Sequence, residues 1–388
     1  MSVAADKRRA AGRRLGALGA LCLAALLLAA AAPGVSVAVP PTFAKAVNFG
    51  KGPVRLAIVT ADFDKDGKID LATANATTNN VSVFLGKNAW GSGSQTYHVG
   101  KAPTWLATGD FNKDGCTDLV VSCWDTNSLT ILFGNGHGGF PKVRTVRAAG
   151  APGFVAVADV NGDGNPDLLV ENGVNNTISV LLGKGNGTFT APQKVPHCSV
   201  GWKFAVADLN GDHKLDLIVP GPGGLHVAVL LGKGDGRFGA AKYHVVGPGA
   251  SGVAVADVNQ DGKPDVIVTD MTLKSGAVQI LLGDGHGGLA AAKTFPAGAG
   301  AMWTAVGDFN RDGDLDLAVA DNVADSVSVL VGNGSGHFAA PITCKASVSP
   351  RCLVVGNLDA DSKPDIAVAN YDGNISIIKN TTALARRW

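Results

Sequence analysis

The sequence has almost no excess of charge of either sign. Its 388 residues include 33 Lys and Arg against 32 Asp and Glu, for a formal net charge of +1 at pH 7. Proteins that bind nucleic acid through a basic surface show a clear imbalance. We therefore expect no nucleic-acid partner.

The motifs of common catalytic centres are also missing. The chain has no Gly-x-Ser-x-Gly turn, no His-Glu-x-x-His pair and no phosphate-binding loop. The apolar segments of its repeats lack the 3.6-residue period of amphipathic helices. These absences weigh against an enzyme, without excluding one, and they favour an all-β fold.

A long apolar run occurs near the N-terminus. Residues 15–32 are apolar, five basic residues between Lys7 and Arg14 precede them, and Ser36-Val37-Ala38 follows. This order predicts a signal peptide over residues 1–38 and a secreted, periplasmic or cell-surface protein. The alternative is an uncleaved membrane anchor, because the run reaches roughly the 18 residues that can span a bilayer. A membrane is an expected partner only in that case.

An acidic motif recurs seven times along the rest of the chain. It has Asp or Asn at positions 1 and 3 and Asp at positions 5 and 9. The copies, which we call loops 1 to 7, start at Asp62, Asp110, Asp159, Asp208, Asp257, Asp308 and Asn357. Their spacing of 48 to 51 residues predicts a solenoid, a propeller or an array.

The third repeat shows the plan of the predicted unit. Strand-forming segments at 154–158, 168–171 and 178–182 are separated by the acidic loop and a polar turn, and a Gly-rich turn at 183–187 precedes a fourth strand near Phe189. Seven such units predict a seven-bladed β-propeller of four-stranded antiparallel blades over residues 39–383. Residues 384–388 are then a C-terminal tail.

The two ends of the repeat region are complementary. The seventh repeat stops after its third strand at 374–378, and the segment 43–49 resembles the fourth strands that begin at Phe189, Phe238 and Phe338. We expect the N-terminal strand to complete the last blade, which closes the ring and removes an exposed sheet edge.

The acidic loops have the chemistry of a calcium site. Oxygen side chains at positions 1, 3, 5 and 9 can surround one centre, and Gly at position 6 permits a left-handed turn. Oxygen ligands in a flexible loop favour Ca²⁺ over Zn²⁺ or Mg²⁺. The alternative is an acidic turn without metal.

The loops, the Val-Ala-Val-Ala-Asp-type strands before them and the Gly-x-Gly-x-Gly-x-Phe turns after them resemble the FG-GAP/VCBS repeats of integrin α-subunit propellers and secreted bacterial proteins. The resemblance covers about residues 43 to 380. It implies Ca²⁺ binding through the side chains at positions 1, 3, 5 and 9 and the backbone carbonyl at position 7.

The implied side-chain ligands are Asp62, Asp64, Asp66 and Asp70; Asp110, Asn112, Asp114 and Asp118; Asp159, Asn161, Asp163 and Asp167; Asp208, Asn210, Asp212 and Asp216; Asp257, Asn259, Asp261 and Asp265; Asp308, Asn310, Asp312 and Asp316; and Asn357, Asp359, Asp361 and Asp365. The implied carbonyl ligands belong to Lys68, Cys116, Asn165, Lys214, Lys263, Asp314 and Lys363. Five loops match the pattern. Loops 4 and 7 are expected to bind more weakly, because His213 and Ser362 replace the Gly and Asn357 replaces the first Asp. Metals in these loops would be structural rather than catalytic.

A recognition site is predicted on the face of the propeller opposite the acidic loops. Aromatic residues at strand starts and in loops are expected to gather there, namely Trp105, Trp124, Phe154, Trp202, Trp303 and Tyr371. Carboxylates and amides of Asn75, Asp125, Glu171, Asp270, Asp321 and Asn370 are expected beside them. Aromatic faces next to polar groups suit a sugar or a protein partner. The alternative is that these aromatics only pack between blades.

Three functions remain open from the sequence. The first is a secreted Ca²⁺-binding propeller that acts as a non-catalytic interaction or adhesion module for an unknown protein or glycan. The second is a secreted polysaccharide-active enzyme, similar to a lyase, that uses the same face. The third is a structural module of a larger assembly.

Cys344 and Cys352 are candidates for a disulfide. An oxidising compartment would allow them to bridge the segment between them, which contains Pro350. The alternative is two free buried thiols.

Overall fold

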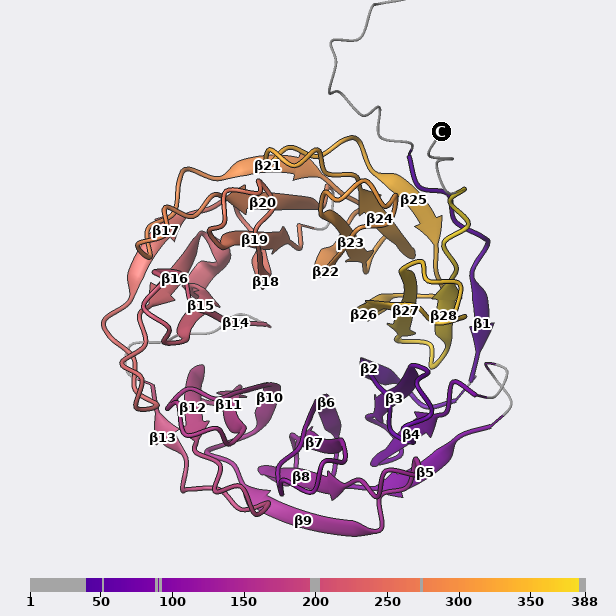
Figure 1. Ribbon diagram of the computed structural model, residues 1–388, viewed down its shortest axis with the longest axis vertical. Helices are drawn as coiled ribbons and strands as arrows, with labels where there is room; N and C mark the ends of the chain where they lie inside the picture. The colour runs from indigo at the N-terminus through magenta and orange to yellow at the C-terminus, as the bar shows by residue number, and fades with distance from the viewer. Residues whose placement is uncertain are drawn as a thin grey trace, which may run out of the picture. The chain divides into compact units, whose positions relative to one another are not determined.

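The structure is a computed structural model that describes residues 40–50, 52–87, 90, 93–195, 203–272 and 275–383. Seven four-stranded antiparallel sheets are arranged in a ring around a common axis (Figure 1). This confirms the predicted seven-bladed β-propeller. The predicted signal peptide and the predicted C-terminal tail lie outside the described residues.

Each blade contributes its first strand to the axis and its last strand to the rim (Figure 1). Blades 1 to 3 are β2 (Arg55–Ala61), β3 (Asp70–Asn75), β4 (Asn80–Phe84) and β5 (Gln95–His98); β6 (Pro103–Gly109), β7 (Asp118–Cys123), β8 (Ser128–Phe133) and β9 (Lys142–Arg147); and β10 (Pro152–Ala158), β11 (Asp167–Asn172), β12 (Thr177–Leu181) and β13 (Gln193–Lys194). Blades 4 and 5 are β14 (Ala205–Ala207), β15 (Asp216–Pro220), β16 (His226–Leu230) and β17 (Lys242–Val245); and β18 (Ala250–Ala256), β19 (Asp265–Asp270), β20 (Ala277–Leu281) and β21 (Lys293–Pro296). Blades 6 and 7 are β22 (Ala301–Gly307), β23 (Asp316–Asp321), β24 (Ser326–Leu330) and β25 (Ile342–Lys345); and β26 (Pro350–Gly356), β27 (Asp365–Asn370), β28 (Ile375–Ile378) and β1 (Val47–Phe49). A short 3-10 turn, η1 (Pro222–Gly224), lies between β15 and β16.

The core lies between neighbouring blades. Side chains of blades 1 and 2 form one cluster that includes Val81, Val83, Leu119 and Val121. The second strand of a blade is covered on both faces, so β3 and β7 are buried along their whole length, and such strands read as continuous apolar runs. The rim strand β9 is mostly exposed.

The N-terminal strand completes blade 7. Strand β1 pairs antiparallel with β28, with Val47 opposite Ile377. Phe43 bridges Asn380, as Phe189 bridges Gly183 in blade 3. The predicted closure by the N-terminal strand is thus confirmed.

A β-bulge interrupts the start of the axial strand in six blades. The register shifts between Arg55 and Ala57 in β2 and between Pro350 and Cys352 in β26, and β6, β10, β18 and β22 have an equivalent shift. A bulge inserts one unpaired residue and redirects nearby side chains. The propeller therefore presents side chains at the end of the axis that a regular strand would not.

The predicted disulfide is wrong. Cys344 and Cys352 are both free and buried, as Cys123 is, and Cys116 is free and partly buried. Cys344 lies on the rim strand β25 of blade 6, whereas Cys352 lies on the axial strand β26 of blade 7. A blade spans three strand spacings of about 4.8 Å, whereas a disulfide needs Cα atoms within about 7 Å of each other.

Within the described part of the chain, no helix is long and apolar enough to cross a membrane.

Candidate functional site: acidic loops and an axial pocket

The acidic loops fold around their own carboxylates. In loop 1, the carboxylate of Asp62 accepts the backbone N–H groups of Asp66 (3.1 Å) and Gly67 (2.9 Å). In all seven loops, the carboxylate at position 5 accepts the N–H at position 7. The spacing of the motif therefore sets the geometry of the loop.

The carboxylate at position 9 connects each loop to the end of the third strand of its own blade. In all seven blades, one oxygen accepts the N–H at position 2 of the loop and the other accepts an N–H beyond the third strand, at 2.7 to 3.0 Å. Sequence reasoning assigned these residues only as metal ligands. Burial raises the pKa of Asp118 to about 6 and that of Asp316 to about 7.

In two loops, three carboxylates lie close together. Carboxylate atoms of Asp62, Asp64 and Asp70 lie within 4.8 Å of each other, as do those of Asp359, Asp361 and Asp365. Buried Oδ1 atoms of Asp64 in loop 1 and Asn357 in loop 7 have no hydrogen-bond partner among the described residues. Oxygen atoms without a donor, next to carboxylates, fit a hard cation such as Ca²⁺.

Lysine side chains neutralise some of the same carboxylates. Lys363 Nζ lies 2.9 Å from Asp361, Lys379 Nζ lies 3.0 Å from Asp359, and Lys87 Nζ lies 2.5 Å from Asp64. The loops therefore attract positive charge, which is the property that a cation site requires.

Position 6 has a left-handed backbone in every loop. The φ angle is +83° at Gly67 and +77° at Gly262, but also +62° at His213 and +65° at Ser362. The expectation that loops 4 and 7 place a side chain in the left-handed turn is confirmed. Their metal affinity stays a prediction.

Hydrogen bonds connect the loops into a ring. Five Gly N–H groups in the turns after the third strands donate to the carbonyl at position 2 of the preceding blade's loop, for example Gly187 to Phe111 O at 2.7 Å. Asn380 Nδ2 makes the equivalent bond from blade 7 to Phe309 O (2.7 Å), and Trp90 Nε1 makes it from blade 1 to Leu358 O (3.2 Å). Each loop is therefore connected to its neighbouring blade.

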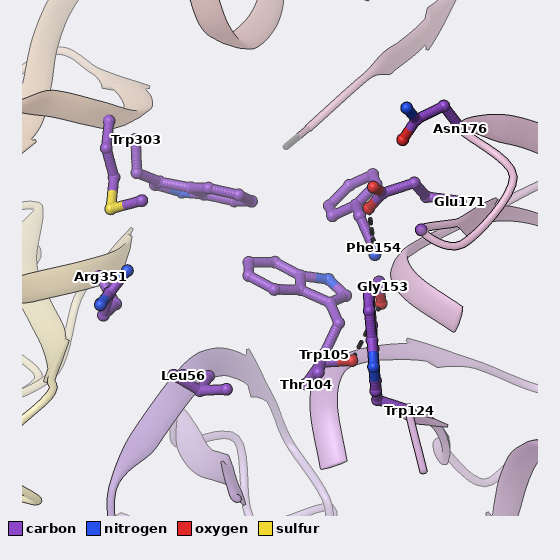
Figure 2. A pocket seen from close by; sticks show the side chains of 12 residues that line it. Leu56, Thr104, Trp105, Trp124, Gly153, Phe154, Glu171, Asn176, Trp303 and Arg351 are labelled. Atoms are coloured by element: carbon purple, nitrogen blue, oxygen red, sulfur yellow. Dashed lines mark hydrogen bonds between the residues drawn. The ribbon is translucent and has the colours of Figure 1, made fainter. Parts of the chain in front are cut away.

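A pocket of about 380 Å³ opens at the axis, on the face opposite the loops (Figure 2). Its walls come from five blades, and its lining residues are Leu56, Thr104, Trp105, Trp124, Gly153, Phe154, Glu171, Gly173, Asn176, Met302, Trp303 and Arg351. Leu56, Thr104, Met302 and Arg351 are the residues that the β-bulges insert. No single blade could form this pocket.

Three rings of the pocket lining occupy equivalent positions in their blades. Trp105, Phe154 and Trp303 each lie five positions before the acidic loop of their blade, and the same position holds Ala57, Lys203, Gly252 and Cys352 in the other blades. Trp105 of blade 2 and Trp303 of blade 6 meet across the axis with ring centroids 4.5 Å apart, and Phe154 lies 5.1 Å from Trp105. Lys203 Nζ lies 3.7 Å from the Trp303 ring centroid and donates to Thr304 O at 3.2 Å.

Charged groups stand on opposite sides of the tryptophan pair (Figure 2). On one side, Glu171 accepts the N–H of Phe154 at 3.0 Å, and burial raises the pKa of its carboxyl to about 7. On the other side, the Arg351 guanidinium lies 4.7 Å from the Tyr371 ring centroid. Burial lowers the pKa of Lys203, whose ammonium group lies against the Trp303 ring, to about 8.

The predicted aromatic residues meet different outcomes. Trp105, Trp124 and Trp303 line the pocket, and Tyr371 lies under Arg351. Trp202 lies outside the described residues. Trp105 and Trp303 also pack on each other, so these two residues serve as packing between blades, as the alternative prediction stated. Trp124 is 38% exposed and Tyr371 is 46% exposed, so both rings are open to solvent.

Most of the polar residues expected on this face are buried inside blades. Asn75 donates to Ser82 Oγ (2.8 Å) and Asn370 to Ser376 Oγ (2.9 Å), whereas Asp321 accepts from Ser328 (2.7 Å). Asp270 is buried as well. The expectation that these four serve a surface site was wrong, because all four are buried and Asn75, Asn370 and Asp321 connect the second and third strands of their blades. Sequence reasoning also missed Arg351 and Lys203, since neither belongs to a motif.

Together, the ring of blades and the seven acidic loops define a β-propeller built from sequence repeats. A model of the FG-GAP-like repeat matches residues 62–121, 110–170, 172–219, 208–268, 257–319 and 309–368. The chain belongs to the FG-GAP repeat family. A search of the curated proteins finds no significant match.

Solved structures show a similar fold. The structure of BBS1N in complex with ARL6DN, soaked with lead, is 14% identical, has a TM-score of 0.59 and covers 90% of this chain and 99% of that one. The same complex soaked with mercury has a TM-score of 0.60 at 14% identity and covers 89% and 98%. At this identity the likeness concerns the fold alone.

Proposed function

We propose that the chain is a secreted or cell-surface, Ca²⁺-stabilised interaction module that binds a protein or glycan through the axial pocket without catalysis. The observation that supports this most is the pocket itself. It is open, lined by Trp and Phe rings, has a few polar groups, and lies on the face away from the loops. Pockets of this composition and size are typical of ligand sites.

The proposal is also supported by the separation of the acidic loops and the pocket on opposite faces of the propeller. Backbone N–H groups satisfy the position-9 carboxylates, and the loops are bonded to neighbouring blades. Ca²⁺ there would hold the ring together, while the pocket stays free for a ligand. Five intact loops are the expected strong sites, and loops 4 and 7 are the expected weaker ones.

A glycan array tests the proposal directly. The wild-type chain, with Ca²⁺, should bind a subset of glycans, and Trp124→Ala should lose this binding while keeping the wild-type melting temperature. A matched control is Tyr243→Ala, because Tyr243 is an exposed rim residue (51%). Equal binding by wild type and Trp124→Ala would contradict the role of the pocket.

A polysaccharide lyase is a second candidate function. The observation that favours it is Glu171, because a carboxyl with a pKa near 7 can serve as a general base at neutral pH. Incubation with acidic polysaccharides, followed by detection of unsaturated products, tests this candidate. Products formed by the wild type and absent with Glu171→Gln would establish it in place of simple binding.

A further inference from the structure

Arg351 is a cation without an anionic partner beside the pocket. Among the described residues, the ion pairs involve other Lys and Arg side chains, and none includes Arg351. Its buried Nε atom has no hydrogen-bond acceptor. Its guanidinium lies over the Tyr371 ring, 4.7 Å from the centroid, which holds it in place without satisfying its donors. A buried guanidinium donor without an acceptor is costly, so a ligand acceptor would gain much by reaching it.

The surroundings of Arg351 favour an anion over a cation. Lys203 adds a second positive charge, which lies over a face of the Trp303 ring, 3.7 Å from its centroid. Glu171 is the acidic residue of the lining, and burial raises the pKa of its carboxyl to about 7. At neutral pH about half of these carboxyls are protonated, and the protonated form can donate a hydrogen bond to a ligand oxygen instead of repelling it.

The remaining wall suits the apolar face of a ring. The exposed Trp124 indole lies against Gly173, where an added Cβ would be only 2.1 Å from Trp124 Cη2. Gly153 likewise leaves space for Glu171, whose Oε2 would lie 2.3 Å from a Cβ at that position. Asn176 and Thr104 add neutral polar groups. Sugar rings combine one apolar face with many hydroxyl groups, which matches this arrangement.

We propose that the axial pocket binds a carboxylate-bearing sugar, whose carboxylate pairs with Arg351 and whose ring stacks on the tryptophan side chains. This inference rests on the proposed binding function and specifies its ligand. An Arg–carboxylate pair is planar and can form two parallel hydrogen bonds. Neutral sugars and amines lack the group that would satisfy Arg351.

The first experiment compares two ligands with the same sugar backbone, one with free carboxylates and one with methyl-esterified carboxyl groups. Titration calorimetry of the full chain in Ca²⁺ would use an oligogalacturonate and its fully methyl-esterified form. A charge-assisted hydrogen bond predicts that the free acid binds about tenfold more tightly or better. Equal affinities for acid and ester would overturn the proposal and leave the general binding function intact.

Variants of Arg351 test the assigned residue. Arg351→Gln removes the positive charge and should lower the affinity for the free acid to the affinity for the ester. Arg351→Lys keeps the charge but cannot form two parallel hydrogen bonds with a carboxylate, so its affinity for the free acid should lie between those of the wild type and Arg351→Gln. The matched control is Arg237→Gln, which removes an exposed Arg whose partner is Asp235. Melting curves identify any variant that fails to fold. A folded Arg351→Gln protein with wild-type preference for the acid would also overturn the proposal.

Further ligands separate this inference from the proposed function. Tight, Trp124-dependent binding of a neutral oligosaccharide would refute the acidic-sugar assignment while supporting a glycan module. An oligoglutamate peptide with the same number of carboxylates serves as a second probe. If the chain binds this peptide and does not bind the oligogalacturonate, the acidic-sugar proposal is refuted and an acidic protein is the ligand. The absence of any binding that depends on Trp124 would refute both proposals.

Discussion

At the scale of single residues, burial at the axis sets the chemistry of the pocket. The carboxyl group of Glu171 has aromatic neighbours and accepts a backbone hydrogen bond from Phe154. Such a site favours the neutral form of a carboxyl. Ionising Glu171 in the folded state therefore lowers the free energy of unfolding of the whole chain.

Stability should respond to pH through Glu171. The pKa is raised from 4.5 to about 7 in the fold, so the folded state binds more protons between these values. Its contribution is fully present below about pH 4.5 and is lost as the pH rises through about 7, with an upper limit of about 3 kcal/mol. Urea unfolding of wild type and Glu171→Gln, in constant excess Ca²⁺, should give a difference that grows in favour of the variant from pH 5 to pH 8. A pH-independent difference would contradict this.

Backbone strain at position 6 gives a second residue-scale prediction. His213 and Ser362 hold φ angles of +62° and +65°, which cost a side-chain-bearing residue about 1 kcal/mol or more. His213→Gly and Ser362→Gly should each raise the free energy of unfolding by up to about 1 kcal/mol. The reverse change, Gly262→His, should lower the free energy of unfolding by a similar amount. A Cβ at position 262 meets no atom within 4 Å, so the cost comes from the left-handed backbone and not from a steric clash. Destabilisation by His213→Gly in a denaturant titration would refute the strain argument.

The prediction from sequence worked where a pattern repeated. The period gave seven blades, and the likeness of Phe43 to Phe189 predicted the closure, because both occupy the same bridge position. It failed for Cys344 and Cys352, since separation along the chain does not reveal that one lies at the rim and the other at the axis. The environment of Arg351 could not be predicted from the sequence either, because no local sequence pattern marks a β-bulge or a contact across the axis.

At the scale of secondary-structure elements, the position-9 carboxylate joins three parts of a blade. Asp167 accepts from Val160 N (2.9 Å) and Gly183 N (2.7 Å), so it connects the loop, the second strand and the turn after the third strand. Both of its oxygens act as acceptors from the backbone. A side chain with a single acceptor cannot replace it.

Asp167→Asn should therefore destabilise the chain even without metal. The amide must place an NH₂ group against one of the two backbone N–H groups, and leaving a buried donor unsatisfied costs about 1 to 3 kcal/mol. Urea unfolding in the presence of a chelator measures this cost apart from any metal contribution. The matched control is Asp235→Asn, at an exposed turn residue, which should change the free energy of unfolding by less than about 0.5 kcal/mol. Similar values for the two variants would show that position 9 acts only as a metal ligand.

At the scale of the whole molecule, the loops and the pocket depend on the same ring. Seven hydrogen bonds, one for each loop, link the loops to neighbouring blades, and two of the seven come from the side chains of Trp90 and Asn380, near the closure of the ring. The pocket draws its residues from five blades. Any weakening of the links between blades therefore changes both the stability of the propeller and the shape of the pocket.

Chelation should lower the melting temperature markedly if the loops hold Ca²⁺. A ligand at 100 times its Kd stabilises the folded state by about 2.7 kcal/mol per site, so five intact loops predict a loss of more than about 10 °C. Differential scanning calorimetry with EDTA, then with excess Ca²⁺ or Mg²⁺, measures the loss and its reversal. Ca²⁺ should restore the melting temperature more fully than Mg²⁺, because a flexible loop of oxygen ligands satisfies the larger ion. An unchanged melting curve, with metal removal confirmed by elemental analysis, would show that internal hydrogen bonds and lysines alone hold the loops.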